Sequence, residues 1–263
     1  MDARRPSARS LLLVPVGLAV ALLALPLVGL LARAPWSRLA DRLASGAVLD
    51  ALRLSILSST GAALASLVLG LPLALWLSQG RSPWRTTVRL LVVLPMVLPP
   101  VVGGVALLLA FGRAGVIGAP LERVFGLSLP FSGAGVVLAA TWVSLPFFVL
   151  SAEAGLRAFD PRFAAAAASL GAGPWRTFRT VTLPMIAPSL RAGLLLAWAR
   201  ALGEFGATIT FAGNLEGTTR TLPLAVYTAL ETAPEAAIAL SLLLVAISAL
   251  VLFLLRDRWF PVG

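Results

Sequence analysis

The sequence contains no cysteine, no histidine and no lysine among its 263 residues. Without cysteine it forms no disulfide and offers no thiolate, and without histidine it lacks the commonest transition-metal ligand and general base. The missing lysine also excludes the phosphate-binding loop G-x-x-x-x-G-K-[ST], so we expect the chain not to hydrolyse ATP in the usual way. We therefore predict that it is not an enzyme and has neither a metal nor a cofactor of its own.

Charge is scarce as well. Only 12% of the residues are charged, where a water-soluble domain carries about 25%. Hydrophobic residues make up 59%, and the mean hydropathy is +0.96. In a soluble protein the net charge of +10 would suggest nucleic acid, but here the arginines lie in short segments between long apolar runs. The composition predicts an all-α, polytopic membrane protein with no nucleic-acid partner.

Six apolar runs are long enough to cross a bilayer, which takes about 20 residues. The first follows Arg4, Arg5 and Arg9 and could be a signal peptide, since Ala32-Arg33-Ala34 resembles a cleavage site. Its 22 uncharged residues exceed the 7–15 of a signal-peptide core, however, so we interpret it as a span. The predicted transmembrane helices are residues 11–32, 54–80, 90–111, 133–150, 187–212 and 236–255.

The arginines also orient these spans. With the N-terminus inside, the inner segments hold 13 arginines and the outer segments 7, with Arg200 inside the fifth helix. The positive-inside rule then predicts that both termini are cytoplasmic. We expect a cytoplasmic N-terminus (1–10), a single transmembrane domain (11–258) and a short tail (259–263), with an amphipathic piece near 121–127 in the outer loop.

The third predicted helix contains Pro95, Pro99 and Pro100. Three prolines in so short a stretch break or kink a helix. Either the kink serves packing, or it is a bend that lines a translocation path, because irregular backbone at membrane depth is tolerated only beside protein or water.

The fifth predicted helix carries two ionisable residues, Arg200 and Glu204, four positions apart on one face. One reading is a structural pair that neutralises itself. The other is that Arg200 contributes positive potential to an anion path, because ionisable groups at this depth are expensive and mark functional sites. Gly206 nearby allows close helix approach or a gate bend.

Residues 160–190 form a compact polar segment between two spans. Asp160 and Pro161 predict a helix start, and the alanine-rich run that follows has high helix propensity. Gly171 predicts a left-handed cap, and Gly173-Pro174 begins a second helix. Leu183-Pro184 is expected to end that helix, because the residue before proline disfavours the α region. The segment therefore predicts two short helices with an apolar face and a basic face.

This segment resembles the cytoplasmic coupling loop of ABC-importer membrane subunits, which carries the "EAA" motif. Ala166 and Ala167 match the alanines of the motif and Gly171 its glycine, but its glutamate falls on Ala165. The alternative is an ordinary amphipathic interfacial hairpin. The resemblance assigns residues 160–184 to an ATPase-coupling loop with Ala165, Ala166, Ala167, Gly171, Pro174, Trp175, Arg176, Leu183 and Pro184.

Three further stretches are similar to oxyanion-importer permeases. "ARALGEFGATITFAGN" resembles their fifth-helix signature, and "TTRTLPLAVYTALE" and "LPMVLPPVVGGVALLLAFGRAGVIG" resemble the molybdate branch. The resemblance implies the type I ABC-importer permease (MetI-like) fold and molybdate or tungstate as substrate. A sulfate/thiosulfate permease is the alternative. A secondary transporter is less favoured, because it would need several intramembrane carboxylates or inverted repeats. The candidate pathway or gate residues are Pro99, Pro100, Arg200, Glu204 and Gly206.

The resemblance also implies partners. These are a second copy of the chain in a homodimer, two copies of an ABC ATP-binding subunit that holds ATP and Mg, an extracytoplasmic oxyanion-binding protein and membrane lipid. The expected location is the bacterial inner membrane.

Overall fold

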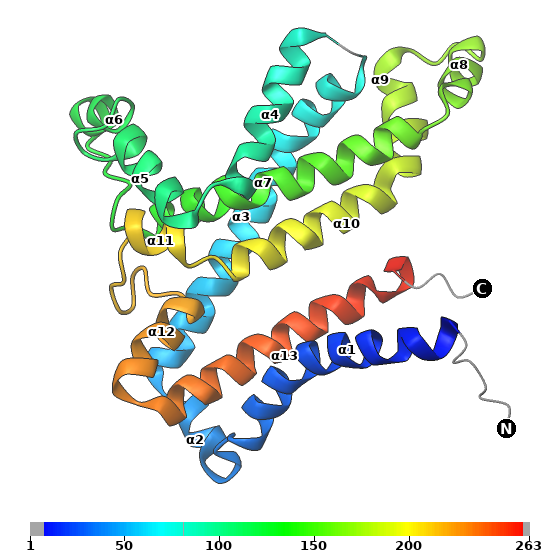
Figure 1. The fold of residues 1–263 in the computed structure, drawn as a ribbon. Coiled ribbons are helices and arrows are strands. Elements are labelled where there is room, and N and C mark those ends of the chain that lie inside the picture. The colour runs from blue at the N-terminus through cyan, green and yellow to red at the C-terminus, as the bar shows by residue number, and fades with distance from the viewer. Residues whose placement is uncertain (1–7, 81, 260–263) are drawn as a thin grey trace, which may run out of the picture.

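The computed structural model describes the backbone of residues 8–80 and 82–259, and within them the side chains of residues 12–80 and 82–253. In these ranges every regular element is a helix, and there is no strand (Figure 1). The predicted N-terminal segment and C-terminal tail lie outside the described residues, apart from residues 8–10, which begin the first helix, and residue 259, which ends the last.

Five helices are long and apolar enough to span a membrane, and a bent pair brings the number to six within the described residues. This confirms the predicted polytopic architecture. Four of them are α1 (Ala8–Ala32), α3 (Gly46–Ser78), α7 (Gly133–Ala158) and α13 (Pro234–Trp259), and the remaining one is the continuous span Pro174–Leu202, most of which is α10 (Leu183–Leu202). The bent pair is α4 (Pro83–Val97) and α5 (Pro100–Phe111), with a bend of 120° between them.

Helices α3, α7 and α10 pack together at the centre of the molecule. Small residues allow this: Ala62, Ala140 and Ala201, one from each helix, form a buried cluster. The hydroxyls of Ser66 and Ser144 lie 3.3 Å apart across the α3–α7 contact. Inside a bilayer, where apolar burial gives helices little reason to associate, such close packing and hydrogen bonding hold them together.

The α4–α5 pair breaks where the prolines predicted. Leu98 is extended (φ −66°, ψ 138°), as expected before a proline, and Pro100 starts α5. Pro95, by contrast, stays inside α4. The third span is therefore bent sharply, and α5 turns away to pack against α11 (Gly206–Phe211).

Shorter elements lie between the spans: η1 (Trp36–Arg38), α2 (Leu39–Leu43), α6 (Gly118–Phe125), α8 (Pro161–Ser169), α9 (Pro174–Thr177), the π-helical turn η2 (Phe178–Thr182) and α12 (Leu222–Thr232). The first turn of α1, the last turn of α13 and the α8–α9 corner all lie toward the right of Figure 1. Helix α1 therefore begins, and α13 ends, on the side that carries α8 and α9.

Several predicted bounds were wrong, for identifiable reasons. The fourth helix continues past residue 150 to Ala158, because the charge of Glu153 is matched by two arginines. The fifth helix is not continuous to residue 212: α10 ends at Leu202 and α11 is separate. α12 was not predicted; its first N–H, on Leu222, donates to Ser55 Oγ at 2.7 Å, a contact between residues far apart in the sequence.

Candidate coupling loop and pathway residues

Helix α8 begins as the sequence predicts. The Asp160 carboxylate accepts the backbone N–H of Arg162 at 2.9 Å, so it caps the helix. The guanidinium of Arg162 lies 2.7 Å from the same carboxylate. The side-chain hydrogen bond from Arg162, followed by the backbone one, holds the pKa of Asp160 below its ordinary value.

The corner after α8 is closed by Gly171 in the left-handed conformation, with φ +83°. The N–H of Gly171 donates to Ala168 O at 2.9 Å and that of Ala172 to Ala167 O at 3.1 Å. This pair of bonds is the Schellman motif, which confirms the predicted cap. No atom would lie within 4 Å of a Cβ at Gly171, so the backbone conformation and not lack of space calls for glycine.

The second helix of the loop does not end at Leu183-Pro184, so that prediction was wrong. α9, η2 and α10 form one helical span from Pro174 to Leu202. The Leu183 N–H donates to Phe178 O, five residues earlier, and Leu183 itself is helical (φ −60°, ψ −47°). Pro184 has no N–H, and its ring crowds the preceding turn. We attribute the wider π turn to this, because one extra residue relieves the crowding without breaking the helix.

Apolar side chains are exposed on the loop, between the end of α7 and the first turns of the helical span that starts at Pro174. Leu170 is 90%, Trp175 71% and Phe163 51% exposed, and Trp175 stacks on Phe178 at 5.7 Å between ring centroids. We call Phe163, Leu170 and Trp175 the coupling patch. Exposed apolar side chains on a connecting segment make it a candidate interaction surface.

The other predicted loop residues lie around this patch. Ala165, Ala166, Arg176 and Pro184 are exposed, whereas Ala167 and Leu183 are half-buried. Pro174 is exposed and is the first residue of α9, with Gly173 as its cap, as predicted. The only acidic residue of segment 160–184 is Asp160, which is paired with Arg162, so the exposed Arg176 and Arg179 give the loop a basic edge.

The structure brings the predicted pathway residues together. A Cβ built on Gly206 would lie 2.5 Å from Cβ of Pro100, and one on Gly104 would lie 2.5 Å from Cβ of Thr210. Thus α5 and α11, each following a break in a longer helix, pack backbone against backbone. Pro99, exposed, forms the cap of α5.

Glu204 lies at the break between α10 and α11, and its side chain is 2% exposed. One carboxylate oxygen is 2.8 Å from Arg200 Nη1, and the other accepts the Ala207 N–H at 2.7 Å. The carboxylate therefore neutralises Arg200 and satisfies a free N–H of the first turn of α11. Arg200 is 29% exposed, so one side of this pair remains accessible.

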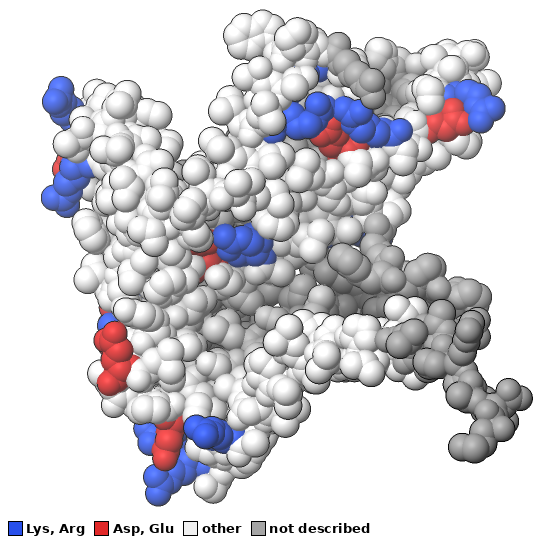
Figure 2. Space-filling view, viewed as in Figure 1, with Lys and Arg blue, Asp and Glu red and all other residues white. Residues whose placement is uncertain are grey.

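A second group of charged side chains, around the buried Glu153, is not predicted from the sequence. Glu153 of α7 accepts hydrogen bonds from Arg89 of α4 and Arg157 of α7. In Figure 2, cationic and anionic side chains gather over the α4–α7 region, and a smaller group lies over the end of α10. The four-residue spacing of Glu153 and Arg157 was a signal in the sequence, but the predicted helix stopped short of it.

The chain is similar to known transport proteins. The family described as "Binding-protein-dependent transport system inner membrane component" matches residues 66–260. "Molybdenum transport system permease protein ModB" of Mycobacterium tuberculosis (strain ATCC 25618 / H37Rv) is 46% identical over 244 residues, 93% of this chain and 92% of the relative. The Escherichia coli (strain K12) protein of the same name is 42% identical over 210 residues, 80% of this chain and 92% of the relative.

Two solved structures share the fold. A bacterial alginate ABC transporter in complex with a pentasaccharide-bound periplasmic protein aligns with TM-score 0.73 and 18% identity, over 95% of each chain. The inward-facing MetNI methionine ABC transporter aligns with TM-score 0.57 and 18% identity, over 80% of this chain and 94% of the other. ABC-importer permeases work with an ATP-binding subunit and a substrate-binding protein and are not themselves enzymes. On this evidence the chain belongs to the binding-protein-dependent transport system inner membrane components, the multi-pass permease subunits of ABC importers.

Proposed function

We propose that this chain is the membrane-spanning subunit of an ATP-driven importer of molybdate, with tungstate as a second substrate. The observation that carries the proposal is 46% identity over 93% of the chain to proteins named molybdenum transport permeases. A sulfate/thiosulfate permease remains the alternative, and the names of the relatives favour molybdate. A secondary transporter has less support, because both buried glutamates that the structure describes, Glu153 and Glu204, are already paired with arginines.

The energy comes from a separate ATP-binding subunit, which binds the coupling patch. Exposed Leu170 and Trp175 supply apolar contacts, and the basic edge at Arg176 and Arg179 favours an acidic rim on the partner. Ala165 stands where the family motif has glutamate, so the cationic side chains of the loop supply its charged contacts.

Movement of the loop reaches the pathway along a continuous element. The helical span from Pro174 to Leu202 has 29 residues, which corresponds to about 43 Å of α-helix. It ends beside the Glu204 carboxylate that caps α11, and α11 packs against α5. When ATP binding draws two ATP-binding subunits together, the coupling loop is displaced. The helical span from Pro174 to Leu202 transmits this displacement to the α5–α11 pair, which acts as the gate.

We propose a homodimer with two ATP-binding subunits and with the anion path on the two-fold axis, since one chain with six spans is small for enclosing a path. Arg200, half-buried beside the gate, gives that path a weak positive potential. An extracytoplasmic binding protein sets the selectivity. Both termini and the loop face the cytoplasm: α1 starts and α13 ends on the side that carries α8 and α9, and the inner segments hold the arginine excess.

The test is transport by the reconstituted complex in proteoliposomes, with the ATP-binding subunit inside and the binding protein outside. We expect molybdate uptake that requires ATP, is competed by tungstate and is left unchanged by a large excess of sulfate. Uptake of sulfate with no uptake of molybdate would replace the substrate assignment. Uptake without ATP but driven by a proton or sodium gradient would overturn the class.

A further inference from the structure

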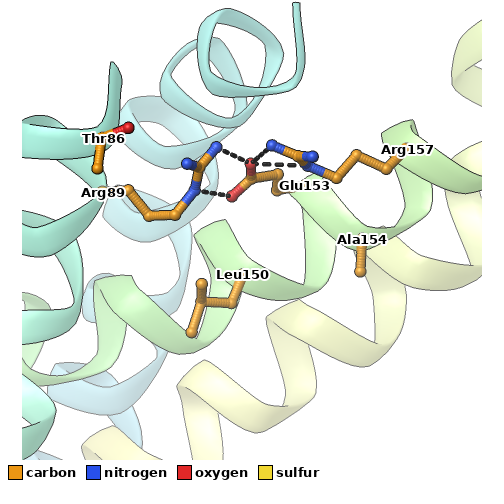
Figure 3. A pocket seen from close by; sticks show the side chains of 6 residues that line it. All are labelled: Thr86, Arg89, Leu150, Glu153, Ala154 and Arg157. Atoms are coloured by element: carbon orange, nitrogen blue, oxygen red, sulfur yellow. Dashed lines mark hydrogen bonds and ion pairs between the residues drawn. The ribbon is translucent and has the colours of Figure 1, made fainter. Parts of the chain in front are cut away.

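A cavity of about 470 Å³ lies between α4 and α7, and the mechanism above makes no use of it. It is lined by Thr86, Arg89, Leu150, Glu153, Ala154 and Arg157 (Figure 3). In the close view, Arg89 approaches from α4 and Arg157 from α7, and both point at the Glu153 carboxylate between them.

The contacts of Glu153 show what this group does. Its Oε2 accepts from Arg89 Nε at 3.3 Å, and its Oε1 accepts from Arg157 Nε at 2.9 Å and from Arg89 Nη2. Arg89 Nη2 also donates to Leu77 O, at the end of α3, at 3.3 Å. One carboxylate, 6% exposed, thus connects α4 to α7 and, through Arg89, to α3.

The net positive charge of the group raises the question of an anion site. Both arginines are already engaged by Glu153, and an oxyanion in the cavity would lie close to that carboxylate and be repelled by it. A charge-assisted, two-point contact of arginine with a carboxylate is instead a geometrically specific bond between helices. The arrangement is therefore better explained as a connection than as a binding site.

The two helices that the Arg89–Glu153 pair connects lead to two functional regions: α7 leads to the coupling loop, and α4 leads to the α5–α11 pair. Glu153 lies in the last turns of α7, which ends at Ala158, immediately before the cap of α8. Arg89 lies on α4, which runs to the break at Leu98 and continues into α5, the partner of α11. A displacement of the coupling loop that moved the end of α7 would carry α4 along only as far as α4 is held to α7.

We propose that the Arg89–Glu153 ion pair makes α4 move with the coupling loop. Nucleotide-driven motion then reaches α5 by a second route, in addition to the helical span from Pro174 to Leu202. Glu153 and Arg89 are positioning residues in this scheme, and neither touches substrate. The inference rests on the proposed function, since it needs an ATP-binding subunit that moves the loop.

The chain offers a matched pair of variants. Arg89→Gln removes the bond between helices while Glu153 keeps Arg157, so no buried charge is left unpaired. Arg157→Gln removes the same charge but leaves the α4–α7 bond in place. The double variant Arg89→Glu/Glu153→Arg exchanges the partners, keeps the net charge and places the carboxylate of α4 between two guanidinium groups of α7.

The first measurement is molybdate uptake and ATP hydrolysis in the same proteoliposomes containing the full complex. We expect Arg89→Gln to hydrolyse ATP but to transport roughly fivefold less molybdate per ATP, at the lower end of typical coupling between sites. Arg157→Gln should lose less, and the exchanged pair should recover most of the wild-type ratio. An unchanged ratio in Arg89→Gln, or equal losses in the two single variants, would overturn the proposal.

The second measurement does not depend on the substrate. Spin labels on Thr87→Cys of α4 and Ser169→Cys of α8, both exposed positions in a chain without cysteine, report the α4–loop distance in the complex. We expect the same distance with and without ATP when Arg89 is present, and a nucleotide-dependent distance in Arg89→Gln. If ATP changes the distance equally in the protein with Arg89 and in Arg89→Gln, the ion pair does not make α4 move with the loop, and the proposal is wrong. If the wild-type complex transports no molybdate yet the distances behave as expected, the substrate is wrong and the connection stands.

Discussion

Pro100 and Gly206, from the two broken spans, are in direct contact: a Cβ at position 206 would lie only 2.5 Å from Cβ of Pro100. Separations under 3 Å require one of the groups to shift, and Pro100 is held by its own ring and by the start of α5. The contact fixes how close α5 and α11 come, and it leads to the first prediction.

Gly206→Ala should push α5 away from α11. We expect a destabilisation of about 1–3 kcal/mol, typical of overpacking, and a loss of uptake larger than the loss of folded protein. Gly203→Ala is the matched control, because Gly203 is exposed and its nearest neighbour would lie at an ordinary 3.8 Å. Thermal unfolding and uptake of the two variants check this. If the two variants have the same stability and the same uptake, the close contact between Pro100 and Gly206 has no role in transport.

Gly171→Ala should weaken the corner of the coupling loop. An alanine at φ +83° costs about 1–2 kcal/mol in local conformation, which corresponds to a roughly five- to thirtyfold loss in the population of the docking geometry. Gly173→Ala is the comparison, since Gly173 has φ −67° and open space around it. Titration of the ATP-binding subunit onto each permease in nanodiscs measures the effect. If Gly173→Ala binds as weakly as Gly171→Ala, the left-handed conformation is not the reason.

Single and double variants can distinguish a structural role of the Arg200–Glu204 pair from a role in the anion pathway. Arg200→Ala alone leaves a buried carboxylate with only the Ala207 N–H and should destabilise by about 3–5 kcal/mol. The double variant Arg200→Ala/Glu204→Ala removes both charges and should fold better. If Arg200 attracts the anion, the double variant will still show reduced molybdate uptake. Normal folding with unchanged uptake would leave the pair a purely structural role.

Acid should release the start of α8. The pKa of Asp160 is lowered in the folded loop, so its contribution is present above the ordinary carboxyl value of about 3.9 and is lost as the pH falls through the lowered value. The first amides of α8 should therefore lose hydrogen-exchange protection, corrected for the intrinsic exchange rate, when the pH is lowered below about 4. Asp160→Asn retains a capping oxygen that does not titrate, so its protection should not change over the same range. Identical pH profiles would contradict the assignment.

Much of the fold could be predicted from local sequence. Apolar run length predicts the spans, and the chemistry of Asp160, Gly171 and Pro174 predicts the corners of the loop, because each depends on interactions within a few residues. The break before Pro100 follows from steric rules for proline.

The remaining features depend on contacts between residues far apart in the sequence. α7 extends through Glu153 because Arg89 of another helix reaches it. α10 ends before Glu204 because that carboxylate caps α11 and Pro100 occupies the space beside Gly206. The predicted helix end at Leu183-Pro184 was wrong because a wider π-helical turn accommodates the proline within the helix. No local propensity indicates such a turn. The Arg200–Glu204 pair was predicted from its four-residue spacing, whereas the contacts of Glu153 with Arg89 and of Gly206 with Pro100 were not.

If a separate ATP-binding subunit drives this permease through the coupling patch, that subunit must lie against Leu170, and crosslinking can detect this contact. The chain has no cysteine, so Leu170→Cys places a single thiol on the patch, at a position that is 90% exposed. Val124→Cys, 70% exposed on α6 in the predicted outer loop, is the control. We expect a short bifunctional reagent to join position 170, and not position 124, to the ATP-binding subunit in the assembled complex. If no such product forms at position 170, or if it forms at position 124, the coupling patch is not where the ATP-binding subunit binds.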